Sequence, residues 1–422
     1  MELCDVRRAA CVAIFFMHAM PSYGAEAADD AVKVSGSVSF MLGEQTASPD
    51  SIFPTEGSAN HPSLVSRKTD TVLKFDRPGS FSAVVDAQYD SRPFSEEQGR
   101  VNQLYASFDV TEALKVRIGK QRVLWGHGFT YIPTDFINPP LDPSGLDLAK
   151  VGVSALSFDY LTDFYAITGI VRGEQKLVDS VGIKFATSAV SGLDLDYIYY
   201  HAPSIGNALG VSFAADATQL LSSALSGLVL FGAFAVNSKS RYPQFIPEQY
   251  SDATATVVYP GVGPVGAAGR FKSYLAGATY QISSDLSVIA EYYGIGDAYS
   301  AADYGNLLGI VSAEGSAGAR LSAPWLNYLA YGRNQRQYVS LSLGQNALTT
   351  GNNRFTDTFG ASLGVLKSPD DGSSLWSLSL KSNYWDRTEV TLRTFVPTGG
   401  RSTEFGSAPY KWYSELGIKI GF

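Results

Sequence analysis

Isolated acidic residues, each set between apolar ones, are the residues in this sequence best suited to act on a solute. Asp86 occurs in FSAVVDAQYD, Asp194 and Asp196 occur in GLDLDYIYY, and Glu291 occurs in SVIAEYYG. Alternation with a period of two places such carboxylates on one face of a β-strand and the apolar residues on the other. Fixed charges that face a common space attract solutes of opposite charge and repel those of like charge. We therefore expect selection by charge from these residues.

The most distinctive stretch is Val116 to Pro143, VRIGKQRVLWGHGFTYIPTDFINPPLDP. It begins as a strand and continues as a loop rich in glycine and proline. Because proline restricts the backbone, this loop can hold a fixed shape. If Val116 and Ile118 occupy the apolar face of the strand, Arg117 and Gln121 lie on the polar face.

Histidine and cysteine offer little for catalysis or metal binding. Both cysteines, Cys4 and Cys11, lie in the first eleven residues. His127 and Asp135 are close in sequence, but no convincing nucleophile accompanies them, and a catalytic triad is recognised by geometry. We predict that the chain is not an enzyme and that it has no metal site and no cofactor.

The N-terminus has the features of a secretory signal peptide. Arg7 and Arg8 form a basic start before an apolar run from Ala9 to Met20, and Ala25-Glu26-Ala27 forms a cleavage site of the Ala-X-Ala type. The apolar run is too short to cross a bilayer as a helix. We predict a signal peptide at residues 1–27, export through the periplasm, and a mature chain at residues 28–422.

The rest of the chain consists of segments of about ten residues with alternating hydrophobicity, which is typical of a transmembrane β-barrel. Turn residues separate the segments, and the connections are alternately short and long. We predict an all-β fold, a single antiparallel up-and-down transmembrane barrel of 16–18 strands, with eighteen as the preferred count. The predicted long connections are 43–64, 122–150, 237–269, 297–335 and 397–409.

The composition agrees with this fold class. Charged residues make up 17% of the chain and the net charge is −8. Ordinary soluble domains contain about 25% charged residues. Nucleic-acid binding and intrinsic disorder both call for more charge than this chain carries, so we expect neither.

The chain ends on a strand, ELGIKIGF, in which apolar residues alternate with polar or small ones. This ending resembles the assembly signal of bacterial outer-membrane barrels, and Glu415, Gly417, Ile420 and Phe422 match that pattern. The resemblance implies the outer membrane of a Gram-negative bacterium. It also implies three partners, namely the barrel-assembly machinery, outer-membrane lipid and lipopolysaccharide.

A second resemblance lies in GKQRVLWG, Gly119 to Gly126. The segment resembles a Gly-Arg/Lys-Gln…Trp-Gly motif of a group of poorly characterised, porin-like outer-membrane barrels, and this implies architecture more than substrate. In general porins the third long connection folds inward and narrows the pore. Asp135, Asp142 and Asp147 would then oppose Arg117 across a constriction. The alternative is a loop that covers the top of the barrel.

A barrel of 16–18 strands leaves an aqueous channel unless it is plugged. We therefore expect a porin-like channel for passive diffusion of small solutes. Two alternatives stay open: a loop-closed accessory barrel of a lipid or polymer export system, and a channel for hydrophobic solutes. Leu225 to Val236 is apolar on both faces. Its inner face therefore either packs against another apolar segment, such as an infolded loop, or lines a path for hydrophobic solutes. A homo-oligomer or an envelope protein partner also stays open.

Overall fold

A computed structural model describes residues 32–48, 51, 63–77, 81–90, 99–138, 151–173, 178–240, 268–314, 334–345 and 358–422. The predicted signal peptide and its cleavage site lie outside these residues. The described residues form eighteen strands, as the preferred count predicted. They are β1 (Lys33–Ala47), β2 (Ser63–Arg77), β3 (Phe81–Asp90), β4 (Gly99–Asp109), β5 (Leu114–Gln121), β6 (Val153–Leu161), β7 (Tyr165–Arg172), β8 (Ser180–Val190), β9 (Leu193–Ala202), β10 (Gly206–Asp216), β11 (Leu228–Lys239), β12 (Ala268–Gln281), β13 (Leu286–Gly294), β14 (Gln337–Gln345), β15 (Phe359–Lys367), β16 (Ser374–Ser382), β17 (Thr388–Thr398) and β18 (Tyr410–Gly421).

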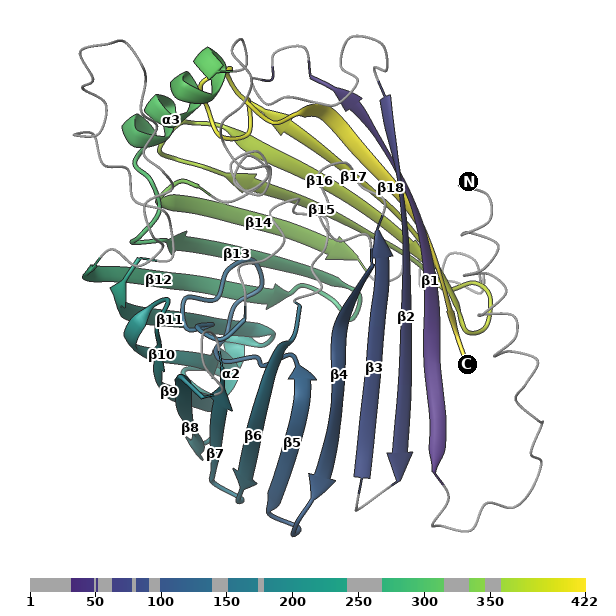
Figure 1. Ribbon diagram of the computed structural model, residues 1–422, viewed down its shortest axis with the longest axis vertical. Coiled ribbons are helices and arrows are strands. Elements are labelled where there is room, and N and C mark those ends of the chain that lie inside the picture. The colour runs from purple at the N-terminus through teal and green to yellow at the C-terminus, as the bar shows by residue number, and fades with distance from the viewer. Residues whose placement is uncertain are drawn as a thin grey trace.

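The strands form one closed antiparallel barrel. Each strand pairs with its neighbours in sequence, and β18 pairs with β1 in register from Ser37↔Gly421 onward. Figure 1 shows the first strand beside the last. The backbone N–H of Phe422 donates to the oxygen of Gly36 at 3.0 Å, and the N–H of Gly36 donates to the oxygen of Phe422 at 3.0 Å. The C-terminus is therefore part of the sheet, which explains why the sequence ends in an alternating strand.

The outer face of the barrel is apolar. On β6, Leu156 and Phe158 are exposed, whereas Ala155 and Ser157 between them are buried inside the barrel. The same alternation leaves large apolar side chains exposed on strand after strand around the wall. A soluble monomer rarely exposes so much contiguous apolar surface.

Short and long connections segregate to opposite ends of the barrel. The short ones include 110–113, 162–164, 191–192 and 282–285, and the long ones run from β5 to β6, from β11 to β12 and from β13 to β14. Most connections follow the predicted asymmetry; the exceptions include 203–205, which is short at the long end, and 346–358, which is long at the short end. Two connections contain helices that alternation did not predict. They are α2 (Ala217–Leu220) and the 3-10 turn η1 (Ser223–Leu225) at the short end, and α3 (Ala301–Glu314) at the long end (Figure 1). No helix among the described residues is long and apolar enough to cross a membrane.

Candidate functional site

The connection that follows β5 folds into the interior of the barrel. Its described part, residues 122–138, contacts the inner faces of strands on both sides of β5. Gly128 has a φ of +147°, and a Cβ at this position would lie 2.4 Å from the backbone oxygen of Tyr131. A residue with a side chain would be strained here, so the sharp bend of the loop depends on glycine. The inward-folded alternative is the one that forms, and we call residues 122–138 the inner loop.

The carboxylate of Glu291 holds the tip of the inner loop. Glu291 lies on β13 and is 3% exposed. The backbone N–H groups of Phe129 and Thr130 donate to its two carboxylate oxygens at 2.7 and 2.8 Å. The Thr130 hydroxyl donates to the Ser340 hydroxyl on β14 at 3.0 Å. Hydrogen bonds to a charged group are among the strong ones, so Glu291 is an anchor for the loop.

Apolar contacts fix the inner loop along the wall from β6 to β11. Trp125 and Ile137 of the loop are each 1% exposed and pack with Ile170 of β7 and Ile198 of β9. Gly182 on β8 makes room for the indole ring, because a Cβ there would lie 2.8 Å from it. These side chains are as fully buried as those in the core of a soluble protein.

A second buried apolar cluster includes β11, whose two faces are both apolar. Phe129 of the inner loop meets Phe231 of β11 edge to face, with ring centroids 5.4 Å apart. The inner face of Leu225 to Val236 therefore packs against the inner loop, which is the first of the two alternatives. Farther round, Tyr131 stacks on Tyr293 of β13 at 5.1 Å.

Helix α3 contributes to this second cluster at the long-connection end. Tyr304 is fully buried there together with Leu308 and with Tyr338 of β14. The Tyr338 hydroxyl and the backbone N–H of Asn334 both donate to the carboxylate of Glu404. Burial first, and then the nearby Glu404 carboxylate, raises the pKa of Tyr304. Tyr304 thus remains neutral, as its dry surroundings require.

On the wall formed by β2 to β4, many of the lumen-facing residues are polar, and Asp86 is one of them. Asp86 is 2% exposed, and Arg122 of the inner loop forms an ion pair with it at 2.8 Å. The side-chain amides of Asn102 and Gln103 on β4 also donate to Asp86, each at 3.1 Å. A β-bulge between β3 and β4 brings both amides to the same carboxylate. Arg122 faces inward, one residue after the inward Gln121, where the regular strand β5 has ended.

Arg117 and Asp135, predicted to oppose each other across a constriction, each have another partner. Arg117 points inward as predicted but makes an ion pair with Asp159 on β6, which also accepts a hydrogen bond from Thr168. Asp135 accepts hydrogen bonds from the backbone and side chain of Asn138, and so stabilises a turn of the inner loop. The reason is register, since pairing of β5 with β6 places Ser157 opposite Arg117 and Asp159 diagonally across from it. Asp142 and Asp147 lie outside the described residues.

Gln121 also points into the barrel, but it is completely buried. It accepts a hydrogen bond from the Ser157 hydroxyl at 2.8 Å and donates to the backbone oxygen of Ala155 at 3.1 Å. In the structure its side chain ties the start of the inner loop to β6.

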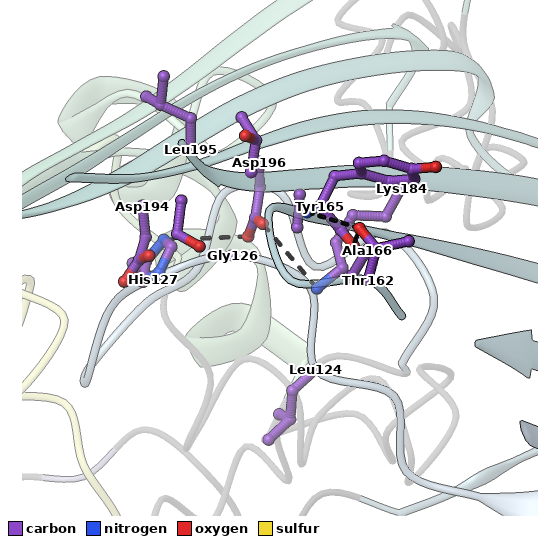
Figure 2. A pocket seen from close by; sticks show the side chains of 13 residues that line it. Leu124, Gly126, His127, Thr162, Tyr165, Ala166, Lys184, Asp194, Leu195 and Asp196 are labelled. Atoms are coloured by element: carbon purple, nitrogen blue, oxygen red, sulfur yellow. Dashed lines mark hydrogen bonds and ion pairs between the residues drawn. The ribbon is translucent and has the colours of Figure 1, made fainter. Parts of the chain in front are cut away.

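Asp194 and Asp196 of β9 line a cavity of about 320 Å³ beneath the inner loop (Figure 2). Asp196 accepts a hydrogen bond from the Ser212 hydroxyl at 3.3 Å. Its carboxylate also lies 3.9 Å from His127 Nδ1 and 4.0 Å from Lys184 Nζ. In the view of Figure 2, Asp194 and His127 lie on one side of Asp196, and Lys184 lies on the other.

The sequence did not single out three of the charged residues in these ion pairs, namely Arg122, Asp159 and Lys184. Lys184 had a usable signal, because it is the one charged residue in VGIKFAT and alternates with Ile183 and Phe185. Arg122 and Asp159 had none, since their partners are set by strand register and a bulge. Among the described residues, no group of three His, Cys, Asp or Glu side chains could hold a metal ion.

Comparison with known proteins yields structural matches. No protein-family model matches the chain, and no curated protein matches it. The crystal structure of Pseudomonas aeruginosa OccK8 (OprE) is 11% identical, with a TM-score of 0.53, over 93% of this chain and 98% of that one. A triple mutant of the Rhodopseudomonas blastica porin is 11% identical, with a TM-score of 0.44, over 93% and 100%. The OccK8 match supports the barrel fold.

Proposed function

We propose that this chain is a channel of the Gram-negative outer membrane, through which small polar solutes diffuse passively. The observation that carries the proposal is the placement of the inner loop. Trp125 and its neighbours pack against the apolar wall, and Arg122 of the same loop faces the polar one. A barrel of eighteen strands is wide enough to leave an aqueous path beside a loop held in this way.

The outer surface supports a membrane location. Large apolar side chains alternate with inward residues on strand after strand, and a closed barrel leaves no unpaired strand edge. The strand containing Glu415, Gly417, Ile420 and Phe422 closes the barrel against β1. Recognition of this strand by the barrel-assembly machinery, and contact of the rim with lipopolysaccharide, belong to the same proposal.

Selectivity in this proposal comes from charged groups around the inner loop. Asp86 and Arg122 form one pair, and Arg117 and Asp159 form another on the neighbouring strands. Asp194 and Asp196 add negative charge nearer the short-connection end. Glu291 and Gln121 contribute indirectly, since they position the loop.

Single-channel recording of the refolded protein in a planar bilayer tests the proposal. We expect steady, ohmic openings. Ser377→Trp adds bulk to the inner face of β16 and should lower the conductance, whereas Leu378→Trp is the matched change on the outer face and should not. A properly folded, heat-modifiable barrel that carries no current would overturn the channel and favour an accessory barrel closed by its loops.

A further inference from the structure

The cavity beneath the inner loop has a definite place in the barrel. Its lining includes His127 of the inner loop, Thr162 in the turn after β6, Ser188 near the end of β8 and Asp194 near the start of β9. The last three positions belong to the short-connection end. The cavity therefore lies between the inner loop and the short-connection end of β7, β8 and β9.

The charges around the cavity are unequal. Asp196 and Lys184 lie within 4.0 Å of each other and offset one another, and Asp196 is further engaged by Ser212. Among the described residues, no side chain forms a hydrogen bond or ion pair with the carboxylate of Asp194. Asp194 is exposed, so its negative charge is open to water and to any cation that enters the cavity.

The size and walls of the cavity limit its occupant. A volume of about 320 Å³ is near the lower end of the range of small-molecule sites. Ala166 and Ala186 line it beside the carboxylates, and both lie on the inner faces of their strands. A short alkyl chain fits against these methyl groups while a cationic end reaches Asp194.

We propose that this cavity binds small organic cations that carry a primary ammonium group, with Asp194 as the anionic partner. As a statement of substrate class, the inference rests on the proposed channel function. The binding itself does not depend on it. Lys184 limits the affinity, because its ammonium group repels the same ligand across the cavity.

Binding and current are measured separately. Isothermal titration of n-butylammonium into the folded protein in detergent reports binding, with butyrate and butanol as anionic and neutral probes of similar size. Bilayer recordings with the same probes report block of the current. Asp194→Asn removes the free carboxylate, and Lys184→Met removes the repelling charge. Asp76→Asn is the matched control, because Asp76 is an inward carboxylate at the short-connection end of β2.

We expect n-butylammonium to bind and to reduce the current, and butyrate and butanol to do neither. Asp194→Asn should weaken binding at least tenfold, Lys184→Met should strengthen it at least twofold, and Asp76→Asn should leave it unchanged. Binding without any current would support the site and overturn the channel. A current that n-butylammonium does not affect, with no heat of binding, would overturn the site and leave the channel standing. Equal binding by wild type and Asp194→Asn would also overturn the site.

Discussion

The barrel wall from β6 to β14 and the wall from β15 through β18 to β5 share the same alternating strands, yet they present different inner surfaces. The first places Ile170, Ile198 and Phe231 inward, under the inner loop and α3. The second places Lys381 and Glu389 inward, half exposed and paired at 2.6 Å. The outer faces of both walls are apolar.

This difference shows how the inward residues of a barrel wall indicate whether that wall packs against a loop or faces water. An inward apolar side chain gains free energy only if another apolar group covers it. Phe231 has Phe129 of the inner loop, and Tyr293 has Tyr131. Inward polar residues need no such cover when water reaches them. The pattern of inward residues thus indicates which part of a barrel interior the loops occupy.

The largest effect should come from a substitution where the inner loop packs on the apolar wall from β6 to β14. Trp125→Ala removes a ring that is 1% exposed and leaves a cavity between the inner loop and β8. We expect a loss of about 3–5 kcal/mol in the free energy of unfolding, as for other buried tryptophans. Urea titrations in lipid vesicles, followed by circular dichroism and by gel mobility of the unheated protein, measure this loss.

Trp385→Ala is the control for this change, because Trp385 is 58% exposed in the turn between β16 and β17. Exposed substitutions usually change stability by about 0.5 kcal/mol. If the two variants unfold at the same urea concentration, the inner loop does not pack on the wall from β6 to β14.

The sequence predicts the strands well, because each depends on its own period of two. Eighteen strands, the sidedness of the connections and the inward direction of Asp86 and Arg117 all follow from that period. The interaction partners of these side chains do not follow from the period. Whether Arg117 meets Asp135 or Asp159 depends on the register between β5 and β6, which no local pattern encodes.

The same limit explains two other features. Arg122 turns inward where the regular strand ends at Gln121, so alternation no longer determines its direction. Helix α3 lies in a long connection where period-two reasoning predicts only a loop. Its burial against Tyr338 is a contact between segments far apart in sequence.

A smaller effect should follow when Glu291, the anchor of the inner loop, is weakened and the apolar contacts of the loop are left intact. In Glu291→Gln, one side-chain oxygen remains for the N–H groups of Phe129 and Thr130, and an amide N–H₂ faces the other. Hydrogen bonds to charged groups contribute about 1.5–3 kcal/mol, so we expect a loss of that order. Recordings should show a noisier current, because the tip of the loop is less firmly held.

Glu389→Gln is the matched change on the polar wall, where the carboxylate pairs with Lys381 in a half-exposed ion pair. Such pairs contribute about 0–1 kcal/mol, so stability and current noise should change little. An equally large effect of both substitutions would contradict the assignment of Glu291 as the anchor of the inner loop.

The smallest effect should fall on selectivity, where Arg122 of the inner loop meets Asp86 on the polar wall. Arg122→Gln removes a positive charge beside Asp86, while Asn102 and Gln103 still donate to that carboxylate. The ratio of cation to anion permeability should rise about two- to threefold, which corresponds to about 0.4–0.7 kcal/mol. Reversal potentials in a salt gradient measure this ratio, and the change should shrink in 1 M salt because screening weakens the field. Lys120→Gln removes the same charge two residues earlier, from a side chain on the outer face beside Leu104 of β4, and it should leave the ratio unchanged. If Lys120→Gln shifts the ratio as much as Arg122→Gln does, the field arises at the rim of the barrel, and the Asp86–Arg122 pair does not select ions.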